Sequence, residues 1–219
     1  MCAALSSSNN PLQETMSKGV QQQQPTMKDL WNESPTSLVL AHWLHLQVQG
    51  LSTTTTTTTD VVPEIKLYPD AVYYNYFQLG LSILFQPAAG YKPGDRSQLN
   101  ASKLSLKSID VYNESGGKYG TYPNYPLDFS HSSTRAISIS ITAQTPGKDF
   151  VRALGEPERK GGGSGPMSGS IGLWCEWSRL GLMVELGGDD VRGPQAWDKG
   201  GDATWKTITL FAPASTPLS

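Results

Sequence analysis

Cysteine, an excess of charge of one sign and long apolar runs are all scarce in this sequence, and each absence argues against a class of protein. Two cysteines among 219 residues are too few for a disulfide framework and favour a reducing compartment. The 17 basic and 19 acidic residues give a net charge of −2, which argues against a nucleic-acid binder. No window approaches the roughly 18 apolar residues of a membrane span, and no signal peptide is visible. We therefore predict a protein of a reducing compartment that binds no nucleic acid and has no transmembrane segment.

Patterns that carry catalysis or bind metals are missing as well. Cys175 has no histidine or aspartate near it in the sequence, which favours a packed core thiol over a nucleophile. His42 and His45 would share one helix face, but no third ligand stands near them. The aspartates of the last polar loop match no calcium-binding spacing: Asp189, Asp190, Asp198 and Asp202. We therefore predict a protein that is not an enzyme, with no catalytic residues, no cofactor and no metal site.

Composition divides the chain into a low-complexity segment, one domain and a tail. Residues 1–60 are polar, contain a threonine tract at 53–59 and are predicted to be disordered. The single domain is predicted to span residues 61–213, and residues 214–219 form the tail.

One apolar stretch interrupts the low-complexity segment. Leucines and Trp43 recur at helical spacing within residues 37–49, with Thr36 or Ser37 as a cap and Gly50 as a stop. Strand alternation fits part of the same stretch. The pattern favours a short helix, and a strand is the alternative.

The sequence GLWCEWSRLGLMVEL at 172–186 predicts a β-hairpin. Gly181 can adopt the left-handed backbone conformation that a tight turn requires. Alternation places Glu176 and Glu185 on one side of the hairpin and apolar residues on the other: Leu173, Cys175, Trp177, Leu182, Val184 and Leu186. One face can therefore be buried while the other meets water.

A copy of this pattern precedes the hairpin, at residues 72–85 with the sequence VYYNYFQLGLSILF. Gly80 then matches Gly181, and a third strand follows each hairpin, at 107–112 and at 206–211. Alternation in the third strands predicts inward-facing apolar residues: Ile109, Val111, Ile208 and Leu210. Pattern, turn glycine and order agree, so we predict an internal repeat of strand-hairpin-strand units.

A helix is predicted between the two repeats, at 146–154. Thr145 would cap it, Pro146 would occupy its first position, and Gly155 with Pro157 would end it. Such a short helix must pack on the sheet through its apolar stripe of Phe150, Val151 and Leu154. The fold is therefore predicted to be α+β: a largely antiparallel sheet built from two strand-hairpin-strand repeats, with one short helix packed on a face.

A long loop at 113–133 carries the candidate binding residues. It contains several glycines and prolines together with four aromatic residues, Tyr119, Tyr122, Tyr125 and Phe129. Loops of this length inside a domain are usually functional or disordered. The aromatic side chains either form a surface that binds a partner or fold back and cover the sheet, and the sequence leaves both interpretations open.

Several short motifs, taken in order, resemble a known family. They are Asn75-Tyr76-Phe77-Gln78-Leu79-Gly80, Ile83-Leu84-Phe85, Asn124-Tyr125-Pro126, Leu154-Gly155-Glu156-Pro157 and the hairpin at 172–186. Over about residues 61–213 their order is similar to the carboxyl-terminal part of the phagosome assembly factor 1 family. Residues 1–60 show no counterpart of that family's amino-terminal portion.

The resemblance implies a cytoplasmic, non-enzymatic adaptor in autophagy or vesicle traffic. Family members associate with a WD-repeat β-propeller protein at the forming autophagic membrane, so the resemblance implies a protein partner and a peripheral membrane contact. It brings no catalytic residues. The alternative function is a small-ligand or lipid-headgroup binding module that uses the concave side of the sheet.

Overall fold

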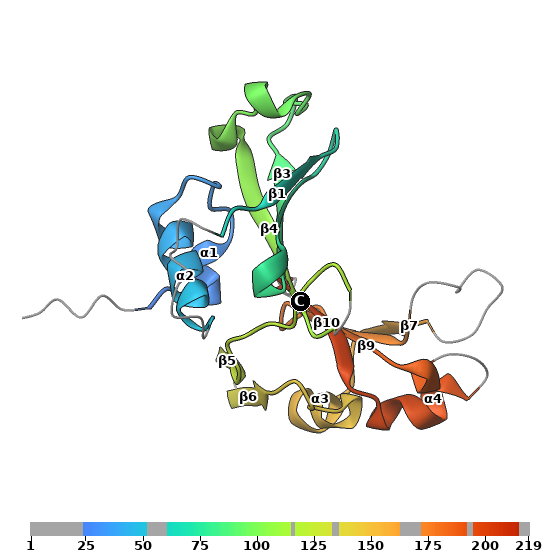
Figure 1. Cartoon of the computed structure of the whole chain (residues 1–219). Coiled ribbons are helices and arrows are strands. Elements are labelled where there is room, and N and C mark those ends of the chain that lie inside the picture. Colours follow the sequence, from blue (N-terminus) through green and yellow to red (C-terminus); the bar gives the residue numbers. More distant parts are fainter. Residues whose placement is uncertain are drawn as a thin grey trace, which may run out of the picture.

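An antiparallel sheet runs through the molecule (Figure 1). The computed structural model describes residues 24–51, 61–114, 117–132, 136–162, 172–191 and 195–214. Eight strands pair in the order β1-β2-β3-β4-β10-β9-β8-β7, and β5 and β6 form a separate pair. The strands are β1 Glu64–Leu67, β2 Val72–Tyr76, β3 Leu81–Pro87, β4 Leu104–Tyr112, β5 Leu127–Ser132, β6 Ala136–Ile141, β7 Arg159–Gly161, β8 Trp174–Trp177, β9 Leu182–Leu186 and β10 Trp205–Phe211.

Short helices flank this sheet. The α-helices are α1 Met27–Leu30, α2 Leu38–Gln49, α3 Gly147–Leu154 and α4 Ala196–Lys199. The 3-10 turns are η2 Phe77–Leu79, η3 Arg96–Gln98, η4 Ala101–Lys103, η5 Asp189–Val191 and η6 Gly200–Asp202. The predicted α+β fold with a largely antiparallel sheet is therefore confirmed. No helix in the described ranges is both long and apolar enough to cross a membrane.

The strand order is symmetric about the pairing of β4 with β10. Along the chain, α2-β1-β2-β3-β4 is followed, after β5 and β6, by α3-β7-β8-β9-β10. The two hairpins close in the same way, with Tyr76 opposite Leu81 and Trp177 opposite Leu182. This order is what two copies of one unit would give if their last strands paired side by side. The internal repeat, as an equivalence of residues, stays a prediction.

The turn glycines tie each hairpin to its third strand. Gly80 and Gly181 have φ angles of 57° and 74°, a region that side chains strongly disfavour. Their carbonyl oxygens accept the amide hydrogens of Tyr112 and Phe211, each at a nitrogen–oxygen distance of 2.9 Å. Both glycines therefore fix where a hairpin meets a central strand.

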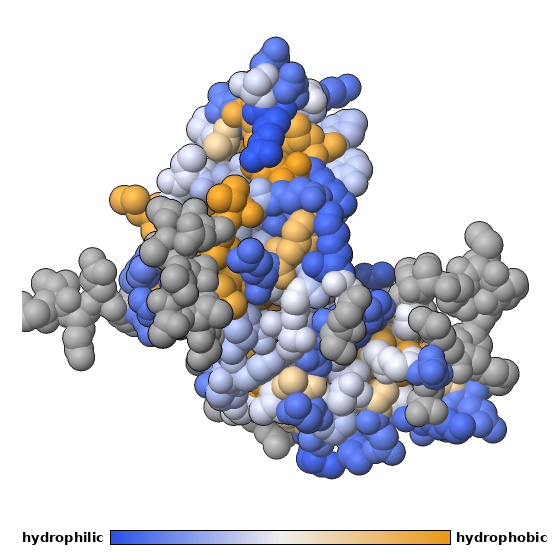
Figure 2. All heavy atoms as spheres, viewed as in Figure 1, coloured by the Kyte–Doolittle hydropathy of each residue, from blue (hydrophilic) through white to orange (hydrophobic). Residues whose placement is uncertain are grey.

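One face of the sheet forms the core, and we call it the inner face. Ile109, Val111 and Trp177 are at most 2% exposed, as alternation predicts, whereas Cys175 is half-buried. The helix α2, the chain around Tyr122, and α3 all pack on this face. Figure 2 shows apolar residues reaching the surface beside α2. The opposite, outer face carries the polar members of the alternation.

Part of the segment predicted to be disordered belongs to this core. Leu30 and Leu40 are at most 1% exposed, and Trp43 is 5% exposed. The backbone at residues 32–33 exchanges two hydrogen bonds with Leu106 of β4. The domain therefore begins before residue 61, and this boundary is corrected. The predictions for residues 1–23, 52–60 and 215–219 lie outside the described residues.

The predicted helix at 37–49 is confirmed as α2, including its cap. The Ser37 hydroxyl accepts the amide hydrogens of Val39 and Leu40, and Gly50 follows the last turn. The start of α3 is a correction, because Pro146 takes the cap position with extended backbone angles. Thr145 instead accepts the amide hydrogen of Thr142 at 2.8 Å, so its hydroxyl stabilises the preceding turn.

Candidate functional site

A row of hydrogen-bonded polar side chains crosses the centre of the outer face. It consists of Asn75, Ser82, Asp110 and Thr209, which are cross-strand neighbours on β2, β3, β4 and β10. Ser82 donates to Asn75 Oδ1 at 2.8 Å, and Thr209 donates to Asp110 Oδ1 at 2.7 Å. Asn75 and Ser82 are buried although they lie on the outer face. Another segment of the chain must therefore cover the end of the row that these two residues form.

The cover is the first part of the predicted binding loop. The Tyr119 hydroxyl donates to Asn75 Oδ1 at 2.6 Å, and its ring stacks on Tyr112 with centroids 3.8 Å apart. The ring of Phe77 meets the Tyr119 ring edge-on, with centroids 4.8 Å apart. The Lys118 ammonium lies 4.2 Å from the centroid of Phe77 and 3.0 Å from a carboxylate oxygen of Glu64.

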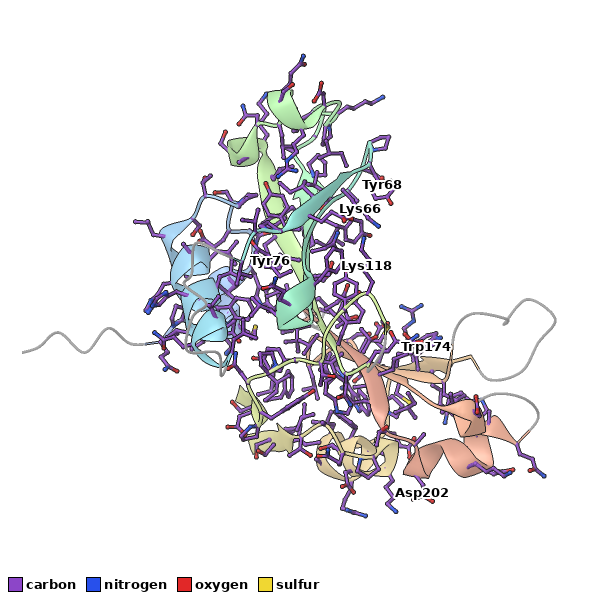
Figure 3. All side chains as sticks on the ribbon, in the orientation of Figure 1. Lys66, Tyr68, Tyr76, Lys118, Trp174 and Asp202 are labelled. Atoms are coloured by element: carbon purple, nitrogen blue, oxygen red, sulfur yellow. The ribbon has the colours of Figure 1, made fainter. Side chains whose placement is uncertain are left out.

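These aromatic residues continue along the outer face to the end of β1. Tyr73 meets Tyr68 edge-on, with centroids 5.8 Å apart, and Tyr68 is 48% exposed. Figure 3 shows Lys66, Tyr68 and Lys118 on one side of the sheet and Tyr76 on the side of α2. We call this set the aromatic surface, and its members are Tyr68, Tyr73, Phe77, Tyr112 and Tyr119.

The structure separates the four aromatic residues that the sequence grouped together. Tyr119 lies on the outer face, whereas Tyr122 is buried on the inner side and donates to Gln47 of α2 at 2.6 Å. The ring of Tyr125 meets both Tyr122 and Trp205 edge-on. Phe129 is in β5 and lines a small cavity beside α1. Tyr122 and Tyr125 therefore cover the sheet, and of the four only Tyr119 joins the aromatic surface.

Asp110 sits where the two halves of the sheet meet. Burial raises the pKa of its carboxyl to about 6; the hydrogen bond from Thr209 opposes this rise, and the Glu185 carboxylate adds to it. Lys206 lies within 4.0 Å of both Glu185 and Glu114. The folded state therefore favours the protonated form of Asp110.

Asp110→Asn should be more stable than wild type at pH 7, by about 1–3 kcal/mol. The folded pKa lies above the unfolded value of about 3.9, so the wild-type protein loses stability as the pH rises from about 4 through 6. Asparagine keeps the Oδ1 acceptor for Thr209 without the charge. Thermal unfolding between pH 4 and pH 8 measures the difference, with the exposed Asp70→Asn as the control. Equal destabilisation by Asp110→Asn at every pH would contradict this assignment.

A half-open groove of about 320 Å³ lies on the inner face between α3, α4 and strands β8 and β9. Its floor includes Val151, Leu173, Cys175 and Leu186, and its rim includes Lys148, Glu156, Lys160 and Trp197. Burial raises the pKa of the Cys175 thiol, while Lys160 opposes this rise, so the thiol is neutral at pH 7. We call it the α3–β9 groove.

The candidate metal ligands can be compared with their positions in the described part of the chain. No group of three or more His, Cys, Asp or Glu side chains is placed there to share a metal ion. His45 contacts Gln49 on an exposed turn of α2, and Asp202 pairs with Lys148. Among the side chains that the structure describes, these candidates do not come together as a ligand set.

Sequence patterns missed the polar row and the groove. Asn75 could have indicated the row, because it is an amide residue within a strand of mostly aromatic residues, and the structure buries it. The groove has none, because residues from α3, β8 and α4 meet only in the folded chain. Comparison of the chain with models of protein families, with curated proteins and with solved structures finds no match in any of the three.

Proposed function

We propose that the chain is a non-enzymatic adaptor that binds a protein partner through the aromatic surface. The observation that carries this proposal is the pairwise packing of Tyr68 with Tyr73 and of Phe77 and Tyr112 with Tyr119 on the outer face. Tyrosine and phenylalanine are enriched in protein interfaces. Apolar area held in place before binding loses little conformational freedom when a partner docks.

Charged side chains around the aromatic surface support a protein as the partner, rather than a wholly apolar ligand. Lys118 and Lys66 both contact Glu64 at its rim, at 3.0 Å and 3.9 Å. A polar rim around a desolvated centre is the usual anatomy of a protein interface. Such exposed ion pairs contribute little to stability, so they are free to exchange partners when the surface is covered.

The identity of the partner is proposed from the resemblance. It would be a WD-repeat β-propeller protein, and the adaptor would act in the cytoplasm, in autophagy or vesicle traffic, with a peripheral membrane contact. We also infer that the two halves of the sheet are an internal repeat. The shared order of elements and the matching glycine hydrogen bonds support this inference.

Replacing an exposed member of the aromatic surface together with a lysine at its rim should remove the partner. In cells that express the tagged full chain, Tyr68→Asp with Lys118→Glu should lower recovery of a cross-linked propeller protein by about tenfold or more. Leu38→Asp with Lys28→Glu is the matched control, because Leu38 is 86% exposed and Lys28 is exposed, and both lie on the α1–α2 side. Quantitative mass spectrometry of the captured proteins measures the ratio.

Two results would overturn the proposal. One is equal recovery of the same partner by both variants, and the other is failure of the wild-type chain to capture any propeller protein. Melting temperatures of the purified variants, expected within a few degrees of wild type, separate lost binding from lost folding.

A further inference from the structure

Beside the α3–β9 groove, Cys175 and Leu186 take the register positions that Tyr74 and Phe85 take in the first half of the sheet. Cys175 pairs with Val184, as Tyr74 pairs with Ile83. Leu186 pairs with Trp205, as Phe85 pairs with Leu106. In the first half the rings of Tyr74 and Phe85 pack edge-on with centroids 5.0 Å apart. With a cysteine and a leucine at these register positions, the second half has no such pair of rings beside the groove.

The groove has an apolar interior and a charged mouth. Its volume of about 320 Å³ is at the lower end of the ~300–1,000 Å³ typical of ligand sites. None of the described residues on its floor is charged, and the neutral Cys175 thiol behaves as a small apolar group. The interior therefore suits one or two apolar side chains and offers little to orient a polar small molecule.

The mouth favours a negative charge beside that apolar group. The Lys160 ammonium lies 5.7 Å from the centroid of Trp197, and Trp197 is 44% exposed. Lys148 is partly neutralised by Asp202 at 2.5 Å, so of the two lysines that line the groove Lys160 is the one better placed to meet a ligand. Glu156 on the same rim disfavours a strongly acidic ligand, which favours a single acidic residue beside Lys160.

We propose that this groove binds an apolar side chain from a peptide segment of a partner protein, with an adjacent acidic residue contacting Lys160. An exposed tryptophan beside an apolar pocket is a common centre of binding energy in protein interfaces. The proposal rests on the function as an interaction protein, but it uses a second surface, on the opposite face of the sheet from the aromatic surface.

A random peptide library displayed on phage and selected on the full-length chain tests the proposal. The selected peptides should share a large apolar residue next to aspartate or glutamate. Two variants fill the groove independently: Cys175→Tyr adds the ring present in the first half, and Gly201→Leu adds bulk where a Cβ meets nothing closer than 3.9 Å. Each should bind the selected peptides about tenfold or more weakly than wild type.

Lys160→Glu tests the charge. It should weaken binding of the acidic peptides and improve binding of the same peptides with lysine in place of the acid, as measured by fluorescence polarisation. The proposal is wrong if the selected peptides bind both filled variants as tightly as wild type, if Lys160→Glu leaves their binding unchanged, or if selection yields no groove-dependent peptide. If the aromatic-surface variant still lost the propeller protein in that case, the proposed function would hold and only the groove proposal would be wrong.

Discussion

Trp177→Ala should unfold a large part of the population, with a loss of about 3–5 kcal/mol from the free energy of unfolding. The side chain is 2% exposed, and its indole nitrogen donates to the carbonyl oxygen of Gly155 at 2.9 Å. Truncation therefore opens a cavity and leaves that carbonyl without its donor. A domain has only ~5–15 kcal/mol of stability in total, so the expected phenotype is low solubility and a much lower melting temperature.

The matched control is the same substitution at an exposed tryptophan. Trp197→Ala should change stability by no more than about 0.5 kcal/mol, because Trp197 is 44% exposed. Glu176, which alternation puts on the water side, is a weaker control, since it accepts from Ser178 at 2.5 Å and pairs with Arg159. Thermal unfolding of both tryptophan variants measures the difference. If Trp177→Ala melted with wild type, the inner-face packing described above would be wrong.

Gly181→Ala should destabilise the protein by about 2–5 kcal/mol, from two causes that add. The φ angle of 74° is in the left-handed region, which alone costs an alanine about 1–2 kcal/mol. A Cβ at this position would also stand 2.2 Å from the carbonyl oxygen of Phe211, so backbone has to move. That movement breaks the hydrogen bond from the Phe211 amide to Gly181.

Gly90→Ala separates the two causes. Gly90 has a φ angle of 79°, but a Cβ there would meet no heavy atom within 4 Å. It should therefore show only the conformational penalty, about 1–2 kcal/mol. Urea unfolding of the two variants gives both free energies. Equal losses would mean that the hairpin turn yields without strain and that contact with Phe211 is unimportant.

Local patterns predicted the hairpins and α2 well because their causes lie close together in the chain. The turn glycines, the strict alternation in β9 and the Ser37 cap all act over a few residues. The predicted cap residue of α3 was wrong because two neighbouring residues, Thr145 and Pro146, could each precede the helix. Thr145 satisfies the preceding turn instead, and a proline can stand at the cap because it needs no amide hydrogen there.

What the sequence could not predict depends on contacts between distant segments. Composition assigned residues 24–35 to disorder, yet Leu30 is fully buried and residues 32–33 bond to β4. The sequence left open whether the aromatic residues of the long loop form one surface or cover the sheet. The loop passes from the outer face at Tyr119 to the inner side at Tyr122. The pairing of β4 with β10 joins the two halves into one sheet and so sets which residues share each face. No local pattern in the sequence specifies this pairing.

That central pairing also sets the order in which the chain can fold. Asp110 and Thr209 are 99 residues apart, whereas Tyr76 and Leu81 close their hairpin over five residues. Loop-closure entropy makes the central contact about 2–3 kcal/mol more expensive to form than the hairpin contact. Until it forms, each half has an apolar strand with an unpaired edge, and β4 of one molecule is a template for β10 of another. The join between the halves therefore exposes this chain to domain swapping during synthesis.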